Sequence, residues 1–325
     1  MQIEVGALVK FNPENALFND NMFVKLRGIL DGITPPSDLP MLDMSIGEPQ
    51  MPGGMILTDS VARHNQDWHF YPKAFGNAQF TDAVCRYIAR RWPLAAPLAE
   101  LRAQIMPVPG TREPLALLGN LVRNTKTDAA ALITNPYYHA WRAGALQSGA
   151  ELVYMDTTAA TGFLPDLDRL TPDLLARTTI MYLCSPSNPQ GAVMDMAYLQ
   201  RALKLARAHD FLLVMDECYA DIWRGEAPTG MAAAAALLQQ EPGAPADPLA
   251  NLVILNSLSK RSSAAGMRAG FLFGDARVIA EYTKLVSNAG SLVPAPLLHV
   301  AADLYDDDAH VDAIRAHYDH SFAIA

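Results

Sequence analysis

The sequence contains little cysteine. Only three cysteines occur in 325 residues, Cys85, Cys184 and Cys218, and no two of them are spaced as Cys-x-x-Cys. Because an odd and sparse set provides no disulfide framework, we expect a protein of a reducing compartment, with a cytoplasmic location. The eight histidines show no spacing typical of metal ligands, so we assign no metal site.

The sequence also lacks an excess of basic residues and a long hydrophobic run. Its formal net charge is −9, whereas a surface that binds nucleic acid needs an excess of lysine and arginine. No stretch approaches the ~18 consecutive apolar residues of a membrane span. The N-terminal segment MQIEVGALVKFNPENALF has no continuous apolar core that would indicate a signal peptide. We therefore expect neither a nucleic-acid partner nor a membrane-bound protein.

What the sequence does contain is an alternation of two hydrophobic patterns. Hydrophobic residues make up 50% of the chain, which is ample for a packed core. Six runs rich in Val, Ile and Leu are typical of buried strands, at residues 131–134, 151–155, 179–184, 211–216, 252–257 and 270–274. Helical patterns such as those at 114–124, 196–210 and 276–288 lie between them. This alternation predicts an α/β fold with a mostly parallel sheet and helices on both faces.

Two other segments invite a specific interpretation. The Ala/Pro/Gly-rich residues 225–251 are interpreted as a helix flanked by surface loops. The acidic run DDDAH at 306–310 resembles a metal cluster at first sight, but aspartate is also favoured in the first turn of a helix. We therefore expect a solvated helix start there.

Polar residues follow three of the predicted strands directly. Asn188 follows the run 179–184. Asp216 ends the run 211–216, and Tyr219 follows it. The segment NSLSK, which includes Lys260, begins at the end of the run 252–257. In an open α/β sheet, ligands bind at the carboxyl ends of the strands. We therefore expect these side chains to meet at one edge of the sheet.

A possible anion site lies elsewhere, in the segment VPGTREPLALL. A Gly-Thr turn at Gly110 and Thr111 opens a helix with Pro114 in its first turn, so free backbone N–H groups and the positive end of a helix dipole face an anion. An anion site, a lysine and a buried acid are the parts that a phosphorylated pyridine aldehyde requires. The lysine binds its aldehyde, and the acid keeps its ring nitrogen protonated.

Each of these residues also has an ordinary structural interpretation. A single lysine after a strand is usually a surface charge, an Asp-Glu pair can cap a helix, and Asn-Pro favours a turn. Tyr71 and Tyr138 are compatible with core aromatics. The S-x-S-K setting of Lys260, with Arg268 eight residues later, favours the functional interpretation.

The motifs together resemble those of the class I/II, fold-type I aminotransferases that depend on pyridoxal phosphate (PLP). They run in the family's order as IGEP (46–49), YPKAFG (71–76), PGTRE (109–113), NPYY (135–138), SPSNPQG (185–191), DECY (216–219) and SLSKRSSAAGMRAGF (257–271). Several details are similar to the N-succinyl-diaminopimelate aminotransferase branch. The resemblance implies the PLP-transferase fold type I, with a mostly parallel seven-stranded type of sheet. It also implies an N-terminal arm and part of a small domain over residues 1–45, a large PLP-binding domain over 46–300, and the start of an interdomain helix over 301–325.

The resemblance implies a role for each matching residue. Lys260 matches the lysine that binds the cofactor and then moves the substrate proton. Asp216 matches the acid paired with the pyridine nitrogen, and Tyr219 and Asn188 match the pair that bonds the phenolic oxygen of the ring. Tyr138 matches the aromatic residue that stacks on the ring.

The remaining matches concern the phosphate and the substrate. The phosphate cup would consist of Gly110, Thr111, Ser257, Ser259 and Arg268, and Arg268 can bind the phosphate through both guanidinium nitrogens. Tyr71 matches a residue that reaches the phosphate of the neighbouring subunit, which implies a homodimer with shared active sites. Gly47 matches the loop glycine beside the substrate carboxylate. Asn188 would also bind the substrate. The bonds Asn135–Pro136 and Asn188–Pro189 match positions that are often cis.

The chain departs from the family pattern in two places. Pro109 stands where relatives often have a usable N–H, so one phosphate contact is expected to be missing. The sequence stops at RAHYDHSFAIA, where the family continues into a segment that completes the small domain and carries an arginine for the substrate carboxylate. We therefore expect an incomplete small domain.

The resemblance implies PLP-dependent transfer of an amino group between an amino acid and an α-keto acid, with 2-oxoglutarate as the expected partner. Its branch suggests N-succinyl-LL-2,6-diaminopimelate, in lysine biosynthesis. Two alternatives stay open at this point. One is a β-lyase or decarboxylase that uses PLP on the same fold, and the other is a truncated remnant without catalysis.

Overall fold

The computed structural model describes Phe18, residues 22–34, 36, 38, 47–49, 51 and 54–324. The chain divides into two compact units, residues 1–48 and 49–325. The first unit contains helix α1 (Met22–Leu30), which is followed by a turn in which Gly32 has a φ of 78°. A positive φ of this size is readily adopted only by glycine, so Gly32 suits the chain reversal after the helix.

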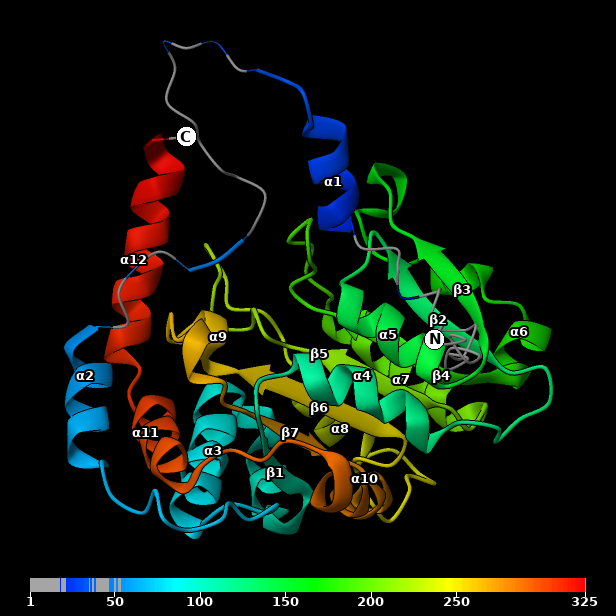
Figure 1. Cartoon of the computed structure of the whole chain (residues 1–325). Helices are drawn as coiled ribbons and strands as arrows, with labels where there is room; N and C mark the ends of the chain where they lie inside the picture. The colour runs from blue at the N-terminus through cyan, green and yellow to red at the C-terminus, as the bar shows by residue number, and fades with distance from the viewer. Residues whose placement is uncertain are drawn as a thin grey trace, which may run out of the picture. The chain divides into compact units, whose positions relative to one another are not determined.

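The second unit is built on a seven-stranded sheet with the order β1-β7-β6-β5-β4-β2-β3 (Figure 1). Its strands are β1 (Ile105–Val108), β2 (Ala130–Asn135), β3 (Glu151–Asp156), β4 (Thr178–Cys184), β5 (Leu212–Asp216), β6 (Leu252–Ser257) and β7 (Gly270–Gly274). Strand β7 pairs antiparallel with both of its neighbours, and every other pairing is parallel. The predicted α/β class and the mostly parallel seven-stranded sheet are confirmed.

Strand β1 is the one strand of this sheet that the sequence pattern did not indicate. It has only four residues, IMPV, and Pro107 lies in its middle. Because proline cannot donate to a strand ladder, it is confined to edge strands, and a short run that contains it resembles a loop. The structure places β1 at the edge of the sheet, paired with β7 alone, where Pro107 lies opposite Phe271.

Helices cover both faces of the sheet, as predicted. The helices of one face are α3 (Ala78–Arg91), α7 (Met196–Ala208), α8 (Met231–Leu238) and α11 (Ala295–Asp306), whose apolar side chains share one hydrophobic cluster. On the other face lie α4 (Arg112–Leu121), α5 (His139–Gln147) and α10 (Ala276–Ala289), which share a second cluster. Helix α8 confirms the helix predicted within residues 225–251.

The remaining elements are short or peripheral. They are α2 (Gly54–Arg63), α6 (Pro172–Arg177), α9 (Leu258–Arg261), α12 (Ala309–Ile324) and the 3-10 helices Pro93–Glu100, Arg102–Gln104, Ala159–Thr161, Leu167–Arg169 and Ala265–Met267. Within the described part of the chain, no helix has the length and apolar character needed to cross a membrane.

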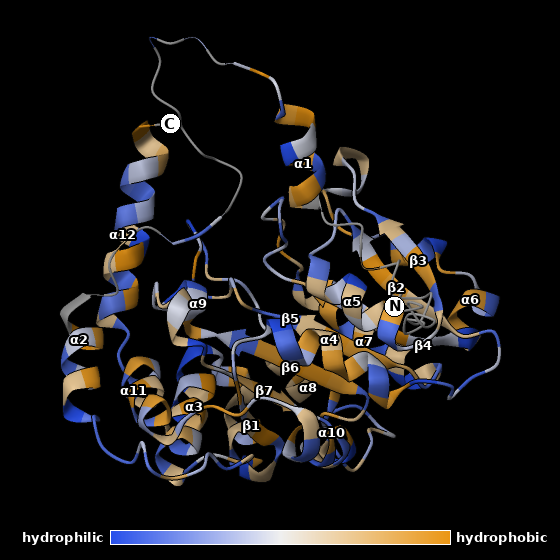
Figure 2. Ribbon diagram, in the orientation of Figure 1, coloured by the Kyte–Doolittle hydropathy of each residue, from blue (hydrophilic) through white to orange (hydrophobic). Residues whose placement is uncertain are grey.

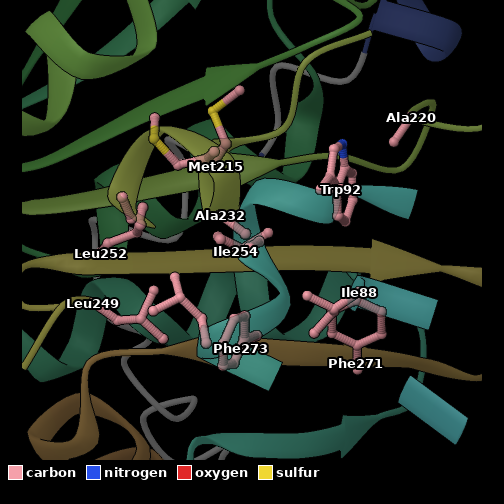
Figure 3. Close-up of a cluster of buried hydrophobic side chains, with 14 of the residues drawn as sticks. Ile88, Trp92, Met215, Ala220, Ala232, Leu249, Leu252, Ile254, Phe271 and Phe273 are labelled. Carbon is pink, nitrogen blue, oxygen red and sulfur yellow. The ribbon is translucent and has the colours of Figure 1, made fainter. Parts of the chain in front are cut away.

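The strands alternate their side chains between the two clusters. In β5, Leu213 and Met215 face the first cluster, whereas Leu212 and Val214 face the second. Figure 3 shows the first cluster, in which Ile254 of β6 and Phe273 of β7 lie among side chains from the covering helices. The central strands are accordingly hydrophobic in Figure 2. A sheet buried on both faces leaves mainly its strand ends to carry polar chemistry.

Residues 301–325, predicted as the start of a long helix, comprise the end of α11 and the whole of α12. The acidic run lies between these helices, and Asp307 accepts a 2.8 Å hydrogen bond from the backbone N–H of His310. The expected helix start is therefore present, and Asp306 and Asp308 are exposed as expected. Asp306 pairs with Arg86 and Asp308 with Arg90, residues of α3 that lie too far away in sequence to be anticipated. Nowhere in the described ranges do three potential metal ligands come together.

Candidate functional site

The register of the sheet brings the predicted residues to one edge. Cys184 at the end of β4 lies beside Asp216 at the end of β5, and Ser257 at the end of β6 lies beside Gly270 at the start of β7. Because β7 runs in the opposite direction, it starts where β6 ends. Arg268, two residues before β7, therefore reaches the same edge as Lys260.

Lys260 is presented by the short helix α9, directly after β6. The hydroxyl of Ser257 caps this helix by accepting a 3.1 Å hydrogen bond from the backbone N–H of Ser259. The half-buried Lys260 points its Nζ toward the ring of Tyr219, 5.9 Å from the ring centroid. The lysine and the tyrosine, which come from the ends of neighbouring strands, thus face each other.

Asp216 lies buried at the end of β5, with 4% of its surface exposed. Burial raises the pKa of its carboxyl, and hydrogen bonds from its neighbours oppose that rise. Its carboxylate accepts bonds from the indole N–H of Trp141 at 3.1 Å and from the backbone N–H of Cys218 at 3.2 Å. A cation placed against this carboxylate would stabilise its charged form.

Trp141 was not identified from the sequence. It lies in the first turn of α5, three residues after Tyr138, which is the extended N-cap residue of that helix. The two rings pack edge to face, with 5.9 Å between their centroids. Its closeness to Tyr138 in the sequence was the one signal that linked Trp141 to the site.

Tyr138 and Tyr219 are neutral phenols at this edge. Burial raises the pKa of Tyr138 to about 12, and the charge of Asp216 adds to the effect. Burial also raises the pKa of Tyr219. Asn188 is half-buried in the loop after β4, and the Asn135–Pro136 and Asn188–Pro189 bonds are cis, as predicted, together with Ser185–Pro186.

Arg268 and Gly110 form the part of the site that suits an anion. The guanidinium of Arg268 donates to the carbonyls of Pro109 at 2.9 Å and of Ala265 at 3.0 Å. Among the described residues, its guanidinium forms no ion pair with a carboxylate, which suits it to an anionic ligand. The space against it is kept open by Gly110, because a Cβ there would lie 2.3 Å from Nη2 of Arg268.

A contact between Thr111 and Cys218 links the anion site at Gly110 to Asp216. The Thr111 hydroxyl lies 3.1 Å from the thiol sulfur of Cys218. Burial raises the pKa of this thiol well above its usual range, so it stays protonated, and either group can donate in this contact. The sequence did not indicate this contact, because the two residues are far apart in the chain.

The two serines of the predicted phosphate cup differ in their surroundings. Ser257 is almost fully buried, and its hydroxyl contacts Ser259 Oγ at 2.9 Å and the Ala269 carbonyl at 3.3 Å. Ser259 is half-buried at the start of α9. Ser259 is therefore the more accessible hydroxyl, and Ser257 holds it in place.

For two predicted residues, the described part of the structure shows no contact with this group. Tyr71 is 96% exposed and so is directed away from the core of its own chain. Gly47 belongs to the unit that ends at Glu48, outside the unit that contains the other site residues. Ile46 of the IGEP motif lies outside the described residues.

A substitution at Gly110 tests the anion part of the site. We expect Gly110→Ala to weaken binding of PLP or inorganic phosphate about tenfold or more, because the new methyl group displaces Arg268 and a φ of 71° disfavours alanine. The measurement is a dissociation constant by calorimetry. The matched control is Gly162→Ala, which has a φ of 61° and no atom within 4 Å of the added Cβ. Equal effects of the two substitutions would contradict a role for the open space beside Arg268.

The arrangement fits a ligand with an anionic end and a basic ring nitrogen. The anion would lie between Arg268, Thr111 and Ser259, near the first turn of α4, and a protonated ring nitrogen would face Asp216. Lys260, which follows the end of β6 beside Asp216's strand β5, would supply an amine for a carbonyl group on the same ring. This is the donor set that holds PLP in proteins.

Comparison with known proteins gives a consistent result. A family model described as "Aminotransferase class I and II" matches residues 40–323. "Probable aminotransferase Rv1178" of Mycobacterium tuberculosis is 31% identical over 278 residues, which are 86% of this chain and 60% of that protein. "LL-diaminopimelate aminotransferase" of Moorella thermoacetica is 30% identical over 253 residues, 77% of this chain and 61% of that protein. The chain thus spans about 60% of the length of these two curated relatives.

A solved structure agrees with the sequence comparison. An aminotransferase from Neisseria meningitidis Z2491 superimposes with a TM-score of 0.87 at 28% identity, and the match covers 96% of this chain and 78% of that one.

Proposed function

We propose that this chain, which belongs to the class I and II aminotransferase family, carries the PLP site of an enzyme that transfers an amino group between an amino acid and an α-keto acid. One observation carries the proposal. Asp216 and Lys260 lie at the ends of the parallel strands β5 and β6, and Arg268 reaches the same sheet edge because it precedes the reversed strand β7. Each of them fits a different part of the cofactor.

The proposed roles are those that the family resemblance implies for these residues. When bound, PLP acts as an electron sink for the bond to be broken at the substrate α-carbon. Asp216 keeps a proton on the ring nitrogen by presenting a buried carboxylate to it. Lys260 Nζ binds the cofactor and, once released, moves the proton at the substrate α-carbon. Arg268, Thr111 and Ser259 bind the phosphate, and Tyr219 and Asn188 bond the ring's oxygen.

The substrate is proposed from the relatives. The Moorella thermoacetica protein is named an LL-diaminopimelate aminotransferase, and the motifs of this chain are similar to the N-succinyl-diaminopimelate branch. We therefore favour a diaminopimelate-type amino donor, N-succinyl-LL-2,6-diaminopimelate in the first place, with 2-oxoglutarate as acceptor in lysine biosynthesis.

A second copy of the chain is the proposed protein partner. The segment around Tyr71 exposes several large side chains, namely Trp68, Phe70, Tyr71 and Phe75, of which Tyr71 is 96% exposed. Exposed apolar groups gathered in one segment are typical of an interaction surface. In a homodimer Tyr71 would reach the phosphate site of the neighbouring subunit.

The experiment combines absorption with a product assay. We expect purified protein mixed with PLP to show visible absorption. Borohydride reduction should remove this absorption and leave PLP attached to Lys260, as located by peptide mapping. With the diaminopimelate donor and 2-oxoglutarate, we expect glutamate to form.

Other outcomes would identify other functions. Formation of pyruvate and ammonia without an acceptor would identify a β-lyase, and release of carbon dioxide would identify a decarboxylase. Cofactor binding without any turnover would identify a remnant that lacks catalysis.

A further inference from the structure

The helix that carries Lys260 is too short to fix its own position. Helix α9 has four residues, LSKR, and a single turn is unfavourable without tertiary contacts because nucleation costs more than one hydrogen bond returns. Its first end is held by Leu258, which is fully buried, and by the Ser257 cap. The position of Lys260 therefore depends also on the contacts at the other end of the helix. The last residue at that end is Arg261.

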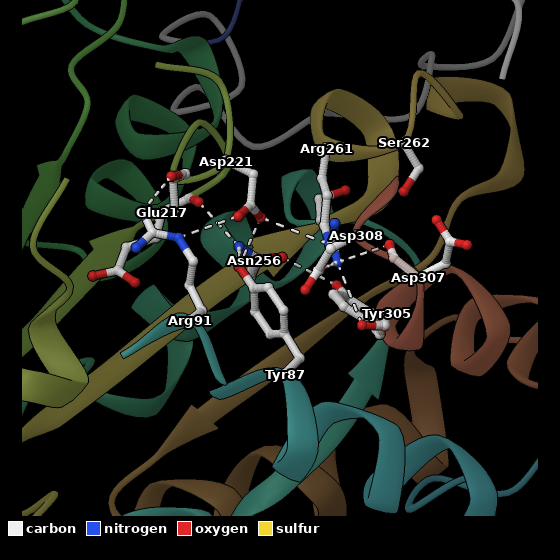
Figure 4. Close-up of polar contacts among 12 residues, drawn as sticks. Tyr87, Arg91, Glu217, Asp221, Asn256, Arg261, Ser262, Tyr305, Asp307 and Asp308 are labelled. Carbon is white, nitrogen blue, oxygen red and sulfur yellow. Dashed lines mark hydrogen bonds and ion pairs between the residues drawn. The ribbon is translucent and has the colours of Figure 1, made fainter. Parts of the chain in front are cut away.

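Arg261 is almost completely buried, with 1% of its surface exposed. Its Nη2 donates to Asp308 Oδ1 at 2.8 Å and to the carbonyl of Tyr305 at 3.3 Å. Its guanidinium lies over the ring of Tyr87, 4.9 Å from the centroid, and its Nε lies 3.7 Å from Asp221. Figure 4 shows Arg261 among these groups, which belong to α3, the loop after β5, and the junction of α11 with α12.

From these contacts we propose that Arg261 is a positioning residue, which ties the Lys260 helix to the α11–α12 junction. The inference rests on the proposed function in one respect, the role of Lys260 as the cofactor lysine. A second contact joins the same elements, because His310 at the start of α12 lies 2.9 Å from the hydroxyl of Ser262. Both contacts act on the end of α9 that Leu258 does not hold.

The network does not need Arg261 in order to neutralise its acids. Asp221 keeps an ion pair with Arg91 at 3.2 Å and a hydrogen bond from the Tyr87 hydroxyl at 2.7 Å. Asp308 keeps its ion pair with Arg90 at 2.8 Å. Removal of the Arg261 charge would therefore leave neither carboxylate without a partner.

Arg261 is also poorly placed as a stabilising residue. Within the described structure, its Nε and Nη1 are buried and have no hydrogen-bond partner. A buried charge with incomplete hydrogen bonding is costly. An apolar side chain of similar length would remove this cost and would leave Asp221 and Asp308 with their other partners. Its placement is better explained by the geometry that it imposes on α9 than by its contribution to the free energy of unfolding.

The test is Arg261→Met, which keeps the apolar stem and removes the guanidinium. The matched control is Arg86→Met, which breaks the exposed pair of Arg86 with Asp306 between α3 and α11 and leaves α9 untouched. We expect similar melting temperatures for both variants, within a few degrees of the parent protein. We expect only Arg261→Met to weaken PLP binding, by about tenfold, because a displaced lysine meets the cofactor poorly.

A second measurement needs no cofactor. In the cofactor-free protein, Lys260 should react several-fold faster with an amine-acylating reagent in Arg261→Met than in Arg86→Met, as followed by peptide mapping, since a loosened α9 exposes its lysine. Asp308→Asn, compared with Asp306→Asn, provides a milder version in case Arg261→Met fails to fold. It should change binding and labelling in the same direction but less.

The outcomes separate the inference from the proposed function. If the parent protein binds PLP through Lys260 and Arg261→Met equals Arg86→Met in binding and labelling, the positioning role is wrong and the proposed function stands. If borohydride fixes no PLP to Lys260 in the parent protein, the proposed function fails, and the inference falls with it.

Discussion

Replacing Lys260 with alanine is expected to abolish the visible absorption of the PLP-loaded protein and to lower amino transfer at least about 10³-fold. The reason is that one Nζ atom, which lies 5.9 Å from the centroid of the Tyr219 ring, would both bind the cofactor and move the substrate proton. The measurements are an absorption spectrum and a single-turnover rate.

The control for this prediction is Lys284→Ala. Lys284 lies on the outer surface of α10, where its side chain is 68% exposed and pairs with Glu281. An exposed pair of this kind contributes little to stability, so the control should behave as the parent protein does. A borohydride-reducible PLP adduct that persists in Lys260→Ala would show that another amine is the cofactor lysine.

The second large effect is expected for Asp216→Asn. The variant should still bind PLP through Lys260 and the phosphate site, but its turnover should fall by roughly 10²- to 10³-fold. An asparagine has the shape of the aspartate, and its single amide oxygen can accept one of the two bonds that Trp141 and Cys218 donate to different carboxylate oxygens. It carries no charge to keep a proton on the ring nitrogen. The rate constant of amino transfer measures the loss of turnover, and the PLP dissociation constant measures whether the cofactor is still bound.

Glu217→Gln is the matched control, since Glu217 is the next residue and equally buried. Its Oε1 accepts a 2.6 Å hydrogen bond from the backbone N–H of Met231, and the amide oxygen of a glutamine can accept the same bond. Burial raises the pKa of Glu217 to about 7, so near neutral pH the amide resembles a state that the acid already populates. Equal losses of turnover in the two variants would indicate a general effect of buried charge in place of a role for Asp216.

The fold was largely predictable because its signals are local. The runs around Leu213 and Ile254 are apolar, short and bounded by polar residues, which is typical of strands buried on both faces. Strand β1 carries no such signal, since Pro107 is tolerated there only because β1 is an edge strand. Its pairing partner lies at the far end of the sequence, so no local pattern indicates it.

The sequence predicted which residues form the candidate site better than it predicted the residues that surround and position them. Lys260 and Asp216 follow recognisable strands, and their neighbourhood follows from the carboxyl-end rule. The burial of Arg261 could not be anticipated, because a basic residue in a serine-rich stretch resembles a surface turn. It is buried because Asp308, Tyr305 and Tyr87, all distant in sequence, surround it.

The place of β1 in the sheet has a consequence for the order of folding. Strands β2 to β6 lie side by side and are close in sequence, so they can pair as soon as the ribosome has released them. Strand β1 is the first strand of the sheet to be synthesised, but it pairs only with β7, the last one. Val108 therefore stays unpaired until Gly270 has been synthesised. The loop that this pairing closes spans about half of the chain, which makes it a slow, late step. Gly110 lies just after β1 and Arg268 just before β7, so we expect a nascent chain to acquire its anion site only when this final pair of strands has joined.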